Sequence, residues 1–166
     1  MSIPTGMIGS ELSRRLGTSN PDQIVFVGIG NRMRGDDAIG PVLLDRLRGS
    51  ISHLVDTGVT PEEYTGVIKR LNPLSIIFLD AVDFGGMPGQ MRIIEMEEIS
   101  SYQGSTHKIS LDVLMEYLKE ETGADVFLIG VQSAQISYLH GLSPGMTEAL
   151  EACAEQIKVA IKSISH

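Results

Sequence analysis

The sequence predicts an α/β fold, a three-layer α/β/α sandwich in which helices cover both faces of a mostly parallel, twisted sheet of about five strands. Short apolar runs alternate with segments of helical periodicity along most of the chain. The run 75–79, SIIFL, is almost wholly apolar, which is typical of a strand buried on both faces. The 166 residues contain no repeat, low-complexity tract or linker, so we expect a single domain.

The first predicted strand leads through a glycine-rich turn into a helix, within the stretch 24–41, IVFVGIGNRMRGDDAIGP. The apolar run ends at Ile29, and the glycines beside Asn31 predict the turn. Apolar residues then recur at helical spacing, at Ile39, Val42, Leu43 and Leu47. Because ligands bind α/β sheets at the carboxyl ends of strands, residues 31–37 are expected at a site.

The rest of the chain continues this alternation. A Thr-x-x-Glu capping box at 60–63, with Pro61 at the first helical position, predicts the start of the second helix. The segment 90–96 is predicted to be an edge strand, and Gly123 is predicted to end the third helix. The expected elements are strand 23–29, helix 39–48, strand 52–56, helix 61–71, strand 75–79, strand 90–96, helix 111–122, strand 125–131 and helix 144–161.

The segment before the first strand is predicted to be an N-terminal extension, residues 1–22, and residues 23–166 are predicted to form the functional domain. Met7, Leu12 and Leu16 have only a loose helical spacing. We therefore expect a short helix that packs weakly against the domain.

Charge and composition exclude several classes of function. The net charge of −8 argues against nucleic acid and against an anionic membrane surface as partners. No apolar run approaches the ~18 residues of a membrane span, and no signal peptide is expected. Cys153 is the one cysteine, so no internal disulfide can form and a cytoplasmic location is expected.

Three side chains with metal-binding chemistry are expected to converge at one edge of the sheet. Asp37 follows the first strand, Asp80 follows the run 75–79, and His107 precedes a predicted helix. Two carboxylates and an imidazole suit a divalent metal such as nickel or zinc, with positions left open for water or substrate.

Each of these residues also has an ordinary structural interpretation. Asp36 and Asp37 stand at a helix start, where an aspartate most often caps the helix or interacts with its dipole. Asp83 competes with Asp80 for the site, and His107 by itself is typical of a surface or capping histidine. The metal interpretation therefore depends on the three placements together.

A nucleotide site is the weaker alternative for the glycine-rich turn. Its spacing is G-x-G-x-x-x-x-G, which differs from the dinucleotide pattern G-x-G-x-x-G. The acidic second half of the turn would repel a pyrophosphate. A thiol nucleophile is not expected either, because Cys153 falls on the apolar face of the last predicted helix.

Several motifs, in order along the chain, resemble those of the hydrogenase maturation endopeptidases. GIGNRMRGDDAIGP resembles their opening motif, FLDAVDFGGMPG their second and STHKISL their third. VDTGVTPEEY and IGVQ are similar to two further stretches of the family. The resemblance covers the chain from Ile24 to about the last helix, and it is closest to the type that serves the formate-linked hydrogenase 3.

The resemblance implies an endopeptidase that removes a C-terminal extension from the large-subunit precursor of a [NiFe] hydrogenase after nickel insertion. It implies that Asp37, Asp80 and His107 form the metal site, with Asp37 and Asp80 catalytic. The metal would be nickel carried by the substrate precursor, or another divalent metal in the isolated enzyme. Asn31, Asp36 and Asp83 would orient the site.

Two questions stay open at the level of sequence. Hydrolysis of the aspartic type and metal-assisted hydrolysis both fit the residues. The alternative functions are a nickel-binding checkpoint or chaperone for hydrogenase assembly that does not cleave, and a small nucleotide- or phosphate-binding protein.

Overall fold

The computed structural model describes residues 5–17, 19–102, 110–134 and 141–164. In this part of the chain five strands form one sheet in the order β2-β1-β3-β5-β4. They are β1 (Ile24–Gly28), β2 (His53–Asp56), β3 (Ser75–Val82), β4 (Met91–Ile94) and β5 (Asp125–Gln132). Only the pairing of β4 with β5 is antiparallel, which confirms the mostly parallel sheet and the edge position of β4.

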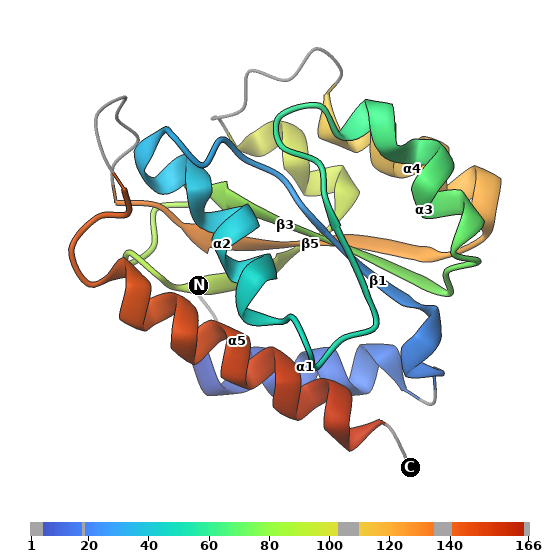
Figure 1. Cartoon of the computed structure of the whole chain (residues 1–166), viewed down its shortest axis with the longest axis horizontal. Coiled ribbons are helices and arrows are strands. Elements are labelled where there is room, and N and C mark those ends of the chain that lie inside the picture. The colour runs from blue at the N-terminus through green and yellow to red at the C-terminus, as the bar shows by residue number, and fades with distance from the viewer. Residues whose placement is uncertain (1–4, 18, 103–109, 135–140, 165–166) are drawn as a thin grey trace.

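Helices cover both faces of this sheet, as the sandwich prediction requires (Figure 1). The α-helices are α1 (Thr5–Leu16), α2 (Ile39–Arg46), α3 (Thr65–Arg70), α4 (Leu111–Thr122) and α5 (Met146–Ser163). The 3-10 turns are η1 (Pro21–Gln23), η2 (Gly35–Ala38), η3 (Pro61–Tyr64) and η4 (Met96–Ser101). The helices α1, α2 and α5 pack on one face, and α3 and α4 pack on the other.

The alternation of side chains along the strands explains why there are two apolar cores. In β1, Ile24 and Phe26 belong to the core beneath α1, α2 and α5. Val25 and Val27 belong to the core beneath α3 and α4. Since successive side chains of a strand point to opposite faces, a strand that is apolar at every position needs helices on both sides.

The expectation of a weakly packed N-terminal segment is wrong. Ile8, Leu12 and Leu16 of α1 are each at most 2% exposed and belong to the same core as α5. Arg15 adds ion pairs to Glu95 and Asp125, which lie far along the chain. The loose spacing concealed a regular stripe at positions 8, 12 and 16 that covers apolar surface left open by the sheet and α5.

The predicted capping box is also wrong, because the Thr60 side chain makes no capping hydrogen bond. The first turn is the 3-10 turn η3, in which the Glu63 N–H donates to the Thr60 carbonyl instead, at 3.0 Å. The helix that follows is short, and its Val67 side chain is 40% exposed.

Within the described ranges, no helix combines the length and the apolar character that crossing a membrane would require.

Candidate active site

The turn after β1 is built around Gly30, which fixes the position of Asp37. A Cβ atom on Gly30 would lie 1.9 Å from the Asp37 carbonyl oxygen, and φ at Gly30 is +149°. Only glycine permits this approach. The Gly30 N–H donates to the Gly58 carbonyl at 2.9 Å, and the Asn31 N–H donates to Asp37 Oδ2 at 2.9 Å. The Asp37 carboxylate is therefore held by backbone on a rigid turn.

Gly40 brings the first turn of α2 directly against Ile29, the residue after β1, and against Leu79 within β3. A Cβ atom there would lie 2.2 Å from the Ile29 carbonyl oxygen and 2.5 Å from that of Leu79. Asp37 lies three residues before this contact, and Asp80 comes directly after Leu79. The backbone thus brings the two predicted acids to the same place, although they are far apart in sequence.

This place is the crevice where an open α/β sheet ordinarily binds its ligand. The chain passes from β1 to β2 on one side of β1 and then returns to β3 on the other side. Such a reversal opens a crevice at the carboxyl ends of the two central strands. Asp80 is 6% exposed, and the register of β3 puts it with Phe78 and Val82 on the face covered by α4.

The predicted third member of the site, His107, lies outside the described residues. They end at Tyr102 on one side of it and resume at Ser110, directly before α4. Among the described residues, no group of three or more His, Cys, Asp or Glu side chains is arranged to hold a metal ion. The structure therefore places Asp37 and Asp80 near the same edge of the sheet, and the three-residue metal site stays a prediction.

Asp36, next to Asp37, connects the start of α2 to the segment after β5. It is completely buried, and its carboxylate accepts hydrogen bonds from the Ala134 N–H at 2.8 Å, the Ser143 N–H at 2.8 Å and the Ser143 hydroxyl at 2.7 Å. These donors flank residues 135–140, which lie outside the described ranges. Asp36 thus ties Ala134, which follows β5, to Ser143, which precedes α5.

Comparison with known proteins matches this sequence and fold to one family. The family model described as "Hydrogenase maturation protease" matches residues 46–160. The hydrogenase 3 maturation protease of Escherichia coli K12 is 30% identical over 138 residues, which cover 81% of this chain and 88% of that protein. The chain belongs to the hydrogenase maturation protease family.

Solved structures of the family share the whole architecture. The crystal structure of a [NiFe] hydrogenase maturation protease, HycI from Thermococcus kodakarensis KOD1, has a TM-score of 0.76 and 34% identity. The match covers 85% of this chain and 93% of that one. The solution structure of the endopeptidase HycI from Escherichia coli has a TM-score of 0.74 and 28% identity, over 82% of this chain and 90% of that one.

Gln132 was not predicted from the sequence as an important residue. It orders the loop after β3 in this maturation protease. Its buried Oε1 accepts the Phe84 and Gly86 N–H groups at 2.9 and 3.0 Å, and its Nε2 donates to Asp83 Oδ1 at 3.1 Å. A polar residue at the end of an otherwise apolar strand is the signal that could have found it.

The same contacts explain the role of Asp83, which was the alternative to Asp80 as a candidate site residue. The hydrogen bond from Gln132, and then that from the Gly85 N–H, lower the pKa of the exposed Asp83 carboxyl below its usual range. These bonds fold the loop on itself, whereas Asp80 lies on the strand at the crevice. Asp80 therefore stays the predicted site residue, and Asp83 has a structural role in the loop.

The side of the crevice towards β2 is held by an ion-pair network that the sequence did not indicate. Arg32 pairs with Asp45 at 2.7 Å and with Asp56 at 2.8 Å. Hydrogen bonding to Asp45, and then to Asp56, raises the pKa of Arg32, and the same bond from Arg32 lowers the pKa of Asp45. Thr57 adds a hydroxyl bond to the Gly28 carbonyl at 3.0 Å. The turns after β1 and β2 are thus joined.

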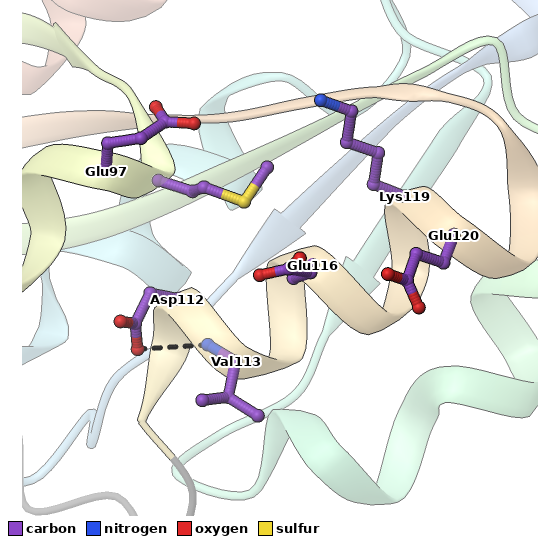
Figure 2. Close-up of a pocket in the computed structure, with 7 residues that line it drawn as sticks. Glu97, Asp112, Val113, Glu116, Lys119 and Glu120 are labelled. Atoms are coloured by element: carbon purple, nitrogen blue, oxygen red, sulfur yellow. Dashed lines mark hydrogen bonds between the residues drawn. The ribbon is translucent and has the colours of Figure 1, made fainter.

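An acidic groove lies apart from this crevice, between η4 and α4 (Figure 2). Its lining residues are Met96, Glu97, Asp112, Val113, Glu116, Lys119 and Glu120. Asp112 Oδ1 accepts the Val113 N–H at 2.9 Å, so this carboxylate is engaged at the start of α4. The groove has the composition of a solvated helix face, and we assign it no part in the chemistry.

Proposed function

We propose that this chain is an endopeptidase that removes the C-terminal extension of a [NiFe] hydrogenase large-subunit precursor after nickel insertion. The observation that carries the proposal is the contact of Gly40 with Ile29 and Leu79, since it brings Asp37 and Asp80 to one crevice in a maturation-protease fold. The relative named as a [NiFe] hydrogenase maturation protease supports the class of substrate. The hydrogenase 3 relative supports the subtype.

The proposed metal site consists of Asp37, Asp80 and His107, and its metal is the nickel that the precursor carries. Carboxylate oxygens with an imidazole nitrogen are ligands that nickel accepts. Asp80 is on the face covered by α4, and His107 comes four residues before Leu111, the first residue of α4, so the histidine is near this face along the chain. Isolated enzyme would bind another divalent ion through the same three side chains.

The chain's own groups would position and activate the scissile bond. The Asn31 N–H on Oδ2 orients the Asp37 carboxylate. A carboxylate in this position can accept a proton from the attacking water as the peptide carbonyl is attacked. Nickel bound beside it would supply Lewis-acid polarisation of the carbonyl.

The proposal is tested by intact-mass analysis of a nickel-loaded large-subunit precursor incubated with the protein. We expect loss of the C-terminal extension with the wild type, and at least a hundredfold slower loss with Asp37→Asn or Asp80→Asn. Asp22→Asn is the matched control, because Asp22 lies in η1, before the amino end of β1. Full cleavage by Asp37→Asn would overturn the site assignment but not the enzyme.

Two further measurements distinguish the alternative function and the two possible mechanisms. A precursor that binds the wild type and retains its extension would favour the non-cleaving checkpoint. Cleavage of nickel-free precursor at the same rate would favour an aspartic-type mechanism without a metal, and cleavage only of loaded precursor would favour metal assistance. We place this reaction in the cytoplasm, because the lone thiol of Cys153 suits a reducing compartment.

A further inference from the structure

Large apolar side chains are exposed on each of the three loops that follow β1, β2 and β3. Met33 is 81% exposed, Met87 is 76% exposed and Val59 is 47% exposed. The two methionines are the most exposed large apolar side chains in the part of the chain that the structure describes. An exposed apolar side chain is common singly, but three around one crevice indicate a binding surface.

The backbone of these loops is fixed, so the side chains are presented rather than loosely placed. The Met33 N–H donates to Asn31 Oδ1 at 2.8 Å, and the Met87 N–H donates to Gln90 Oε1 at 3.0 Å. Val59 follows Gly58, whose carbonyl accepts the Gly30 N–H of the neighbouring turn. The backbone of the three loops is therefore held by hydrogen bonds, while their apolar side chains are exposed to solvent.

All three loops leave the same edge of the sheet, the edge at which Asp37 and Asp80 lie. Strands β2, β1 and β3 are neighbours and run parallel, so the residues after them share that edge. Arg32, beside Met33, is already paired with Asp45 and Asp56. The charge of Arg32 at this turn is therefore already engaged.

We propose that Met33, Val59 and Met87 form an apolar rim that binds large apolar side chains of the precursor on either side of the scissile bond. The identity of the bound peptide rests on the proposed function. A peptide bond that reaches Asp37 and Asp80 must bring its flanking residues across these loops. Methionine suits this task, since its unbranched and polarisable side chain adapts to irregular partners. The rim would thus select an apolar peptide segment at the cleavage site.

The test is the steady-state cleavage of nickel-loaded precursor by Met33→Ser, by Met87→Ser and by the double variant. We expect KM to rise about tenfold for each methionine, with kcat within about twofold of the wild type, because the lost contacts bind substrate without taking part in the reaction. Met33→Leu should restore most of the affinity. Leu74→Ser is the matched control, because Leu74 is 49% exposed at the opposite edge, directly before β3.

An unchanged KM in the double variant overturns the rim. So does an unchanged KM together with a shift from dimer to monomer in sedimentation, because the rim would then bind a second copy of the chain. If the wild type cleaves no precursor, the proposed function fails independently. The rim is then judged by the Kd of the precursor in calorimetry, where the double variant must bind at least tenfold more weakly than Leu74→Ser.

Discussion

At the scale of single residues, the candidate site depends on glycines where a Cβ atom would collide with backbone. Gly30 meets the carbonyl of Asp37, and Gly40 meets those of Ile29 and Leu79. A backbone carbonyl in a packed turn cannot move aside as the end of a flexible side chain can. These two glycines therefore set the positions of Asp37 and Asp80 without contacting substrate.

Gly30→Ala should abolish cleavage of the precursor, because the new methyl group displaces Asp37. Gly58→Ala is the matched control: it also has a positive φ, +56°, but nothing lies within 4 Å of its Cβ position. The control should keep most of its activity and lose only about 1 kcal/mol of stability. Activities measured at matched folded fractions separate the two variants, and equal activities would mean that Gly30 does not position the site.

The Cys153 thiol should be unreactive in the folded protein, in line with the prediction that it is not a nucleophile. Burial is the main cause that raises the pKa of its thiol, from its ordinary value near 9 to about 12. The folded state therefore keeps this proton at pH 9 to 12, where the unfolded chain loses it. The stability that the neutral thiol contributes is present below about pH 9 and declines as pH rises towards 12.

The measurement is labelling with a chromogenic disulfide at pH 8. The native protein should react only as fast as it unfolds, and protein in urea should react at once and completely. Val159→Cys places a second thiol on the exposed face of the same helix, where the residue is 58% exposed. That variant should gain one rapidly labelled thiol. Rapid labelling of the native wild type would contradict the burial of Cys153.

At the scale of secondary-structure elements, α1 is part of the core rather than an appendage. Its buried residues pack beside α5, and Arg15 lies over the ring of Phe127 with 4.0 Å to the ring centroid. Hydrogen bonds to Asp125 and Glu95 raise the pKa of Arg15 despite its partial burial. One helix at the start of the chain thus contacts β5 and the residue that follows β4.

Leu12→Ala should lower the free energy of unfolding by about 2–5 kcal/mol, because it leaves a cavity in a packed core. Leu12 is 1% exposed, and the control Val159→Ala removes an exposed side chain from the helix that packs against α1. Urea unfolding followed by circular dichroism measures both. A loss below about 0.5 kcal/mol in Leu12→Ala would restore the weakly packed extension.

At the scale of the whole molecule, the two cores share one sheet and should unfold together. The central strands β1, β3 and β5 contribute side chains to both cores. Far-ultraviolet circular dichroism and tyrosine fluorescence should therefore give coincident urea transitions. Leu12→Ala should move the single midpoint without splitting it. An earlier, separate transition in that variant would mean that α1 and α5 form an independent unit.

The spacing of apolar residues along the sequence was sufficient to predict the elements whose buried face is set by their own side chains. The apolar stripe of α5 at Met146, Leu150 and Ile157 is buried as predicted, and Gly123 ends α4 with φ at +73°. The strands were predicted to within a few residues of their ends. The pattern failed at α1 and at Thr60, because burial by a distant helix and a 3-10 first turn are tertiary effects.

The sequence by its own chemistry identified the α/β class, the position of Asp37 after the first strand, and a family resemblance that the comparisons confirm. These follow from apolar periodicity, glycine turns and motif spacing, which are local properties. The expectation that Asp80 follows its strand is wrong, because pairing with β5 continues β3 to Val82 and leaves Asp80 inside the strand. The tertiary structure decided that Asp36 holds the segment after β5, that Gln132 orders the loop after β3, and that Gly40 seats α2 on two strands. Each of these contacts joins residues that are distant along the chain, so only the folded backbone could reveal it.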